Sequence, residues 1–193
     1  MDFNKCATID FDDCTANKKK KYTVNRNLFL DKDVKPKYKY KETITFDKKI
    51  KIGKRAICIG LNPAKAEKKI DTSNRRLISL LWDNYDGYDL YNFYPEITDN
   101  KKQINMDDTE NCTFVNHLVG IVTKNTDDIV LFFGRTAVIP RTFVDSFLDK
   151  EHERKIYITV HNGEFTHPGS NAEIQLKSFQ KNYVNTASVI KVK

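Results

Sequence analysis

Polar side chains able to hold a ligand or a water molecule stand at the ends of separate apolar segments. They are Asn62, Asn92 and His167, whose amide and imidazole groups can donate and accept hydrogen bonds. Asn62 follows the short apolar run 57–61, which is typical of a strand covered on both faces. In α/β sheets ligands bind at the carboxyl ends of parallel strands. We therefore expect these three residues and Gly134, which ends another apolar run, to converge on one pocket.

Segments with strand and helix patterns alternate along the chain, and this alternation predicts the fold. The predicted strands span residues 38–46, 50–61, 88–95, 129–134 and 155–160, and the predicted helices span 71–82, 108–124, 140–148 and 172–183. Asp71–Asn74 offer good capping residue types for the first of these helices. We expect an α/β fold, a three-layer sandwich with a mostly parallel central sheet.

Length and composition predict one domain in a reducing compartment. Residues 38–193 are expected to form the domain, and residues 1–37 a basic N-terminal arm or edge strands packed on it. No run of 18 apolar residues exists, so we expect no contact with a membrane. Residues 1–5 lack the apolar core of a signal peptide, so we expect a cytoplasmic protein. We also expect a monomer. The four cysteines form no C-x-x-C pair, so we expect reduced thiols and no metal site.

Positive charge is concentrated in the first third of the chain. The formal net charge is +7, but residues 18–55 hold 15 Lys or Arg against four acidic residues, a local charge of +11. Aromatic residues are interleaved with these cations, as suits a polyanion with stackable bases. A solvated lysine-rich surface explains the same pattern equally well.

Four loop motifs in this order resemble those of the uracil-DNA glycosylase superfamily. The matching segments are Gly60-Leu61-Asn62-Pro63, Tyr91-Asn92-Phe93-Tyr94-Pro95, Phe133-Gly134-Arg135-Thr136-Ala137 and His167-Pro168-Gly169-Ser170. The resemblance covers roughly residues 50–185. It implies a glycosylase-like α/β fold and a monofunctional DNA repair hydrolase without a cofactor, which removes uracil or a related base from DNA after flipping it out of the stack.

The resemblance also implies roles for individual residues. Asn62 would position the attacking water, and His167, neutral and donating, would stabilise the departing base. Asn92 would read the hydrogen-bonding edge of uracil. Further contacts to the base are expected from Gly60, Leu61 and Phe93, the last as a stacking platform. Taken singly, His167 could be an ordinary loop histidine and Asn92 could satisfy a turn.

A bacterial and phage domain family of mobile elements is similar over a shorter stretch. The similarity rests on Leu61-Asn62-Pro63-Ala64 followed by Asp71-Thr72 and Arg75. This family looks like a divergent branch of the glycosylase superfamily. It adds Asp71 and Arg75 as candidate pocket residues, beside Gly134 from the third glycosylase-like motif. From the residues alone, Asp71 and Arg75 could equally be a helix cap and an i, i+4 ion pair.

The expected partner is DNA, preferably single-stranded, because residues 169–171 supply no bulky wedge to open a duplex. Two other functions stay open. The chain could be a catalytically degenerate glycosylase-like protein that binds single-stranded DNA or a partner protein, a glycosylase inhibitor. It could also be a nucleoside- or nucleotide-processing enzyme that uses the same pocket.

Overall fold

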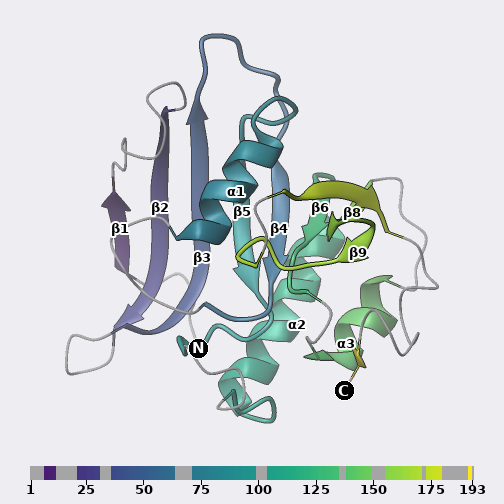
Figure 1. Ribbon diagram of the computed structural model, residues 1–193. Helices are drawn as coiled ribbons and strands as arrows, with labels where there is room; N and C mark the ends of the chain where they lie inside the picture. The colour runs from purple at the N-terminus through teal and green to yellow at the C-terminus, as the bar shows by residue number, and fades with distance from the viewer. Residues whose placement is uncertain are drawn as a thin grey trace.

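A computed structural model gives the structure of the protein (Figure 1). It describes residues 7–11, 21–30, 36–63, 71–98, 104–134, 138–148, 155–170, 173–179 and 191–192. The strands are β1 (Ala7–Phe11), β2 (Lys21–Leu30), β3 (Pro36–Asp47), β4 (Ala56–Gly60), β5 (Gly87–Asn92), β6 (Asp128–Leu131), β7 (Val138–Ile139), β8 (Ile156–His161), β9 (Glu164–Phe165), β10 (Gln175–Ser178) and β11 (Lys191–Val192). The helices are α1 (Thr72–Leu81), α2 (Thr109–Lys124) and α3 (Arg141–Phe143), which continues as a π-helical turn at Val144–Leu148.

The main sheet is mixed, with parallel strands at its centre. Its order in the described part of the chain is β1-β2-β3-β5-β4-β6-β8-β10, and β9 pairs with β8. Strands β5, β4, β6 and β8 run parallel, whereas the strands outside them pair antiparallel. The predicted α/β class is therefore confirmed. The sheet is mixed and not mostly parallel as predicted, because in its described part only the four central strands run parallel.

Side chains of β4 alternate between two apolar cores on opposite faces of the sheet. Ala56 and Cys58 pack in the core that holds the buried residues of α1. Ile57 and Ile59 pack in the core that holds α2 and α3. Helix α1 crosses the face of the sheet turned toward the viewer in Figure 1, so the other two helices cover the far face. A strand covered on both sides explains the continuous apolar run in the sequence.

Capping aspartates define where the two long helices begin. The Asp71 carboxylate accepts a hydrogen bond from the backbone N–H of Asn74, and Asp108 accepts from Glu110 and Asn111. Each carboxylate satisfies an N–H that has no partner inside its helix. The helix starts expected from the sequence are confirmed within two residues.

Two sequence predictions about secondary structure were wrong. The helix predicted over residues 172–183 is, in its described part, the strand β10, which pairs antiparallel with β8. The open edge of β8 offers backbone hydrogen bonds that outweigh local helix preference. The strand predicted from residue 50 begins only at Ala56, because the Asp86 carboxylate accepts hydrogen bonds from the N–H groups of Ile52 and Gly53 and holds that segment as a loop.

The N-terminal segment extends the sheet where the structure describes it. Strands β1 and β2 form one edge, with β2 paired to β3. Cys58 and Cys112 are free thiols, and burial raises the pKa of the Cys58 thiol well above its usual range. Among the described residues, no helix is long and apolar enough to cross a membrane.

Asp128, the first residue of β6, ties together loops at the amino ends of the central strands. Its carboxylate forms an ion pair with Lys54 at 2.6 Å and accepts hydrogen bonds from the Tyr85 hydroxyl at 2.8 Å and the Lys155 N–H at 3.3 Å. Burial by itself would raise the pKa of the Asp128 carboxyl, but the bonds from Lys54 and Tyr85 outweigh it and hold the pKa below its usual range.

Replacing Asp128 should therefore destabilise the fold in a pH-dependent way. At pH 7 we expect Asp128→Asn to lower the free energy of unfolding by about 1–3 kcal/mol, the usual cost of losing hydrogen bonds to a charged group. The stabilisation exists above the unfolded-state pKa of about 3.9 and is lost as the pH falls through the lower folded-state pKa. Urea unfolding at pH 7 and pH 3 should show the difference between variant and wild type shrinking in acid. Asp83→Asn, at an exposed position, is the control, and an equal deficit at both pH values would contradict the account.

Candidate functional site

A pocket of about 120 Å³ lies at the carboxyl edge of the central strands, on the α1 side of the sheet. Amide, imidazole, hydroxyl and charged groups line it together with a few apolar side chains. The lining residues are Lys39, Asn62, Pro63, Asp71, Ser73, Asn74, Leu90, Asn92, Thr98, Phe132 and His167. Asn62, Asn92 and His167 thus come together as the strand ends predicted.

Strand register places these groups side by side. Gly60 at the end of β4 is paired with Asn92 at the end of the parallel strand β5. Phe132 follows β6, whose Leu131 is paired with Ile59. Neighbouring parallel strands end at the same level, so the residues that follow them share one edge.

Gly60 is the point of closest packing beneath the pocket. A Cβ at this position would lie 2.5 Å from Asn92 Oδ1 and 2.8 Å from Phe132 Cζ. Any side chain here would force Asn92 and Phe132 to move, so the present pocket wall depends on glycine at residue 60. Asn92 is 4% exposed, and its side-chain oxygen lies directly over the Gly60 backbone.

Asn62 is held by the loop that follows β5. Its Nδ2 donates to the backbone carbonyl of Thr98 at 2.9 Å and contacts the carbonyl of Pro63 at 3.4 Å. With the amide nitrogen fixed in this way, Oδ1 is the end of the amide that can accept a hydrogen bond from a ligand or water.

His167 has a defined proton position. Its Nδ1 accepts a hydrogen bond from the backbone N–H of Gly169 at 3.0 Å. A nitrogen that accepts this bond carries no proton, so in the neutral ring the proton is on Nε2. The ring lies 5.9 Å from Phe132 between centroids.

Two glycines allow the His167 loop to approach. Gly134 has φ +82°, a conformation that side chains disfavour, and a Cβ there would lie 3.2 Å from the His167 backbone nitrogen. A Cβ on Gly169 would lie 2.9 Å from His167 Nδ1 and 3.0 Å from Ser73 Oγ. Gly134 therefore supports the site from behind the histidine and does not line the pocket.

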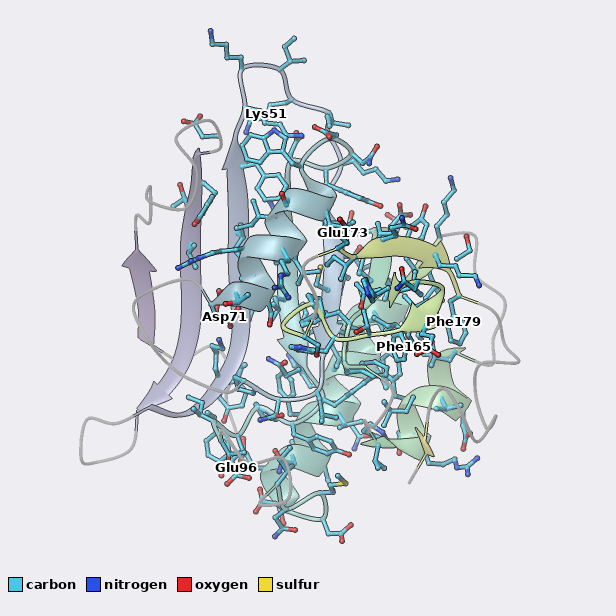
Figure 2. The ribbon with its side chains drawn as sticks, in the orientation of Figure 1. Lys51, Asp71, Glu96, Phe165, Glu173 and Phe179 are labelled. Atoms are coloured by element: carbon cyan, nitrogen blue, oxygen red, sulfur yellow. The ribbon has the colours of Figure 1, made fainter. Side chains whose placement is uncertain are left out.

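The start of helix α1 forms another part of the wall. Asp71 is exposed and lines the pocket while it caps the helix; Figure 2 labels it at this end of α1. Asp71 is therefore both a helix cap and a residue of the pocket wall. Arg75, one turn later, lies instead in a groove of about 600 Å³ that also contains Arg76 and Glu173. Arg76 donates to the carbonyl of Pro168 and so braces the His167 loop.

Two predicted base-contacting side chains lie elsewhere. Phe93 is fully buried against Phe133 and Phe143 in the core on the far face, and Leu61 is 6% exposed in the same core. Consecutive strand residues point to opposite faces, so Phe93 cannot share the face of Asn92. The aromatic side chain in the pocket is Phe132.

Sequence reasoning missed Phe132, Asn74 and Lys39. The alternation of β6 carries the signal for Phe132, because it falls on the same face as Val130, which packs beneath α1. Asn74 and Lys39 belong to a buried hydrogen-bond network with Glu42 that no local pattern marks.

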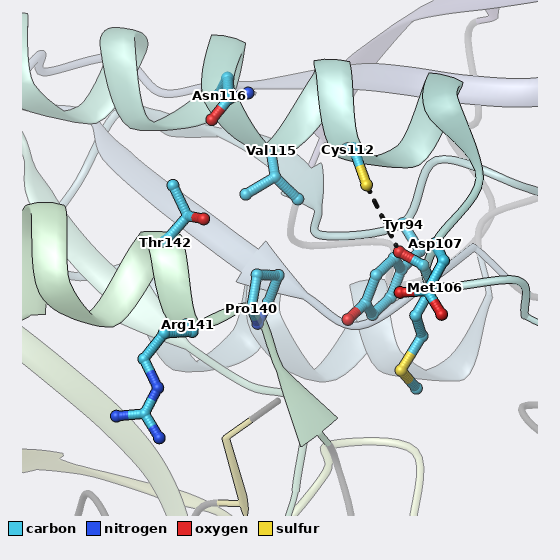
Figure 3. A pocket seen from close by; sticks show the side chains of 9 residues that line it. All are labelled: Tyr94, Met106, Asp107, Cys112, Val115, Asn116, Pro140, Arg141 and Thr142. Atoms are coloured by element: carbon cyan, nitrogen blue, oxygen red, sulfur yellow. Dashed lines mark hydrogen bonds between the residues drawn. The ribbon is translucent and has the colours of Figure 1, made fainter.

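A second hollow of about 210 Å³ lies on the far side of the sheet between α2 and α3 (Figure 3). Its wall includes Tyr94 and Cys112, and the Cys112 thiol donates to the Met106 carbonyl at 3.6 Å. Burial raises the pKa of Tyr94 to about 12. None of the residues predicted for the site lines this hollow.

The comparisons with known proteins give one match. A family model described as "Protein of unknown function (DUF1643)" matches residues 45–169, a range that contains Gly60, Asn62, Asn92 and His167. No curated protein and no solved structure matches the chain.

The packing at Gly60 gives a direct test of the pocket geometry. We expect Gly60→Ala to displace Asn92 and Phe132 and to lower the free energy of unfolding by about 1–3 kcal/mol, the usual cost of overpacking. Gly120→Ala in α2 is the matched control, because its Cβ would meet nothing within 4 Å. That change should be neutral or stabilising by up to about 1 kcal/mol. Equal effects of the two substitutions in urea unfolding would show that the Gly60 contact is unimportant.

Proposed function

The chain belongs to the DUF1643 family, and we propose that it is a DNA glycosylase that hydrolyses the N-glycosidic bond of uracil or a closely related pyrimidine. The proposal extends to the fold, in which the parallel strands β5, β4, β6 and β8 would form the core of a glycosylase-like domain. It draws on the motif resemblance and on the chemistry of the pocket.

The hydrogen bond between Gly169 N–H and His167 Nδ1 is the observation that carries the proposal. It leaves a neutral imidazole with Nε2–H as a donor, in a pocket that also holds two amides. Breaking a glycosidic bond to uracil sends the bonding electrons into the base, chiefly onto its C2 oxygen. A positioned donor is the group that such a developing anion requires.

The size of the pocket suits a single pyrimidine ring. Its volume of about 120 Å³ is close to the roughly 150 Å³ of a protein cavity that accommodates benzene. Phe132 offers an aromatic wall, and Asn92 offers a donor and an acceptor for the edge of the base. A base can reach this pocket only after it leaves the stack.

The proposed reaction has four parts. The Asn62 Oδ1 accepts a hydrogen bond from water and holds it near C1′ of the deoxyribose. The water oxygen bonds to C1′ while the C1′–N1 bond breaks and its electron pair leaves with the base. His167 Nε2–H stabilises the resulting base anion at the C2 oxygen. The proton lost from the attacking water passes to solvent, and the base is protonated after departure.

DNA is the proposed partner, although the basic segment is less free than its charge suggests. Among its described residues, four cations form ion pairs within the protein: Lys39 with Glu42, Lys41 and Arg55 with Asp89, and Lys54 with Asp128. Other lysines of the segment, together with Arg75 and Arg76 in the groove beside α1, are the candidates for phosphate contacts.

Single strands are the proposed substrate. Enzymes that act on duplex DNA must offset a cost of a few kcal/mol for each flipped base. A bulky wedge does not fit at Gly169, the position after Pro168. Even a Cβ there would lie within 3.1 Å of the His167 ring and the Ser73 hydroxyl. Single strands avoid the cost that a wedge would otherwise offset.

Substitution of the two proposed catalytic residues tests the function. We expect His167→Ala to slow single-turnover cleavage of a uracil-containing single strand by about 100- to 1000-fold, the range for losing one oxyanion-type donor. Asn62→Ala should slow the chemical step by roughly 100-fold. Its DNA affinity should stay nearly unchanged, because water placement acts in the transition state. Alkali treatment converts each abasic site into a strand break that can be counted.

His117→Ala provides the control, because His117 lies on α2 away from the pocket and its loss should leave cleavage unchanged. Activity that survives both pocket substitutions would show that other residues carry the chemistry. An absence of abasic sites with the wild-type protein on every uracil-containing strand would favour a DNA-binding protein without catalysis.

A further inference from the structure

A buried ion pair borders the pocket and plays no part in the proposed hydrolysis. Lys39 Nζ lies 3.0 Å from Glu42 Oε2, and the two side chains are 6% and 0% exposed. Lys39 lines the pocket. Burying two charges costs several kcal/mol per ion, and apolar residues of similar size often serve the fold as well. Stability alone therefore gives a weak reason for a lysine at this place.

A β-bulge turns Lys39 toward the pocket. Residues three apart on a regular strand point to opposite faces. Across β2 and β3, however, Asn27 pairs with Lys41 and its neighbour Leu28 pairs with Lys39, so Tyr40 is an extra residue. The Tyr40 hydroxyl donates to Glu110 on α2, whereas Lys39 and Glu42 meet on the other face. Bulges of this kind re-aim side chains beside functional sites.

Helix α1 fixes the carboxylate that holds Lys39. Asn74 Nδ2 donates to Glu42 Oε1 at 3.1 Å, and Asn74 Oδ1 accepts from the Tyr88 hydroxyl at 2.8 Å. Burial raises the pKa of the Tyr88 hydroxyl well above its usual range, so it remains a donor. Both Glu42 oxygens are thus engaged, and the ammonium is anchored at one point while its other N–H groups can donate to a ligand.

The strand order determines on which side of the pocket Lys39 lies. Across the sheet the strand order is β3, β5, β4, β6 and β8. The pocket residues that these strands position therefore follow the same order, which is Lys39, Asn92, Asn62, Phe132 and then the His167 loop. Figure 1 shows β3 and β5 side by side beneath α1. Lys39 therefore lies beyond Asn92, on the side away from His167. If His167 faces the C2 oxygen of a pyrimidine, Lys39 is on the side of the substituent at C4.

We propose that Lys39 is a specificity-determining residue that donates a hydrogen bond to the C4 oxygen of the bound base and so selects uracil over cytosine. This inference rests on the proposed function, which supplies the orientation of the base. Lys39 and Glu42 precede residues 45–169, so the family match assigns them no role.

An ammonium discriminates in a way that an amide cannot. The amide of Asn92 presents either a donor or an acceptor when it rotates by half a turn. The Lys39 ammonium has only donors, so it accommodates the C4 oxygen of uracil and opposes the C4 amino group of cytosine. A site that would leave a buried donor unmatched rejects a similar ligand strongly.

Binding of free bases tests the proposal without any need for catalysis. The dissociation constants of uracil and cytosine are measured by NMR titration for wild type and for Lys39→Met combined with Glu42→Gln. The double variant removes both charges, and the side-chain oxygen of the introduced glutamine can still accept from Asn74. We expect wild type to bind uracil about 10- to 100-fold more tightly than cytosine, the range for a hydrogen bond to a charged group, and the double variant to lose that preference.

Two further variants complete the experiment. Lys41→Met is the matched control, because Lys41 also lies on β3 in an ion pair but does not line the pocket, and Asp89 keeps Arg55. It should retain the preference. Lys39→Gln with Glu42→Gln serves if the methionine variant does not fold, and it should bind the two bases alike because the amide can turn.

The outcomes separate this inference from the proposed function. Selective uracil binding that the double variant abolishes would support the role of Lys39 even in a protein that releases no base. A double variant that cleaves or binds with undiminished preference for uracil would overturn the inference and leave the glycosylase proposal standing. Wild-type protein that binds the two bases equally would also overturn it.

Discussion

The contact between Gly60, Asn92 and Phe132 is the constraint on which the rest of the candidate site depends. Strands β4 and β5 end together, and the missing side chain at residue 60 lets the Asn92 amide and the Phe132 ring meet over bare backbone. The pocket is the space above this contact. One further wall is the start of α1, which contributes Ser73 and Asn74. Another is the His167 loop, which packs closely against Gly134.

Rigid support distinguishes this site from a chance hollow on the surface. The Asn62 amide is held by the Thr98 carbonyl, the His167 ring by the Gly169 N–H and the Glu42 carboxylate by Asn74. Side chains held in this way lose little further freedom when a ligand binds, which is what preorganised binding and catalysis require. The second hollow, between α2 and α3, also has polar side chains in its wall, but none of the residues predicted for the site is among those described around it.

The sequence predicted the parts of the site that follow from strand ends. Asn62, Asn92 and His167 were predicted because each lies near or just past a predicted strand end, and parallel strands end at one edge. The prediction that Phe93 contacts the base was wrong for a reason visible in the sequence, since neighbours on the strand predicted over residues 88–95 face opposite sides of the sheet.

Lys39 could not have been found in the same way. In a segment with a local charge of +11, a lysine is most simply interpreted as solvated, and its burial depends on a bulge and on the antiparallel pairing of β3 with β5. Neither feature has a local sequence signal. Strand β10 was missed for a similar reason, because the free edge of β8 decides its conformation.

We propose that this pocket removes a pyrimidine base from DNA. The most direct measurement incubates the protein with a single strand that contains one uracil and quantifies the free base by mass spectrometry against the abasic sites formed. We expect equal amounts of free uracil and abasic sites, with slower release from the matching duplex. Absence of free base with an intact, correctly folded protein, or strand breakage without base release, would contradict it.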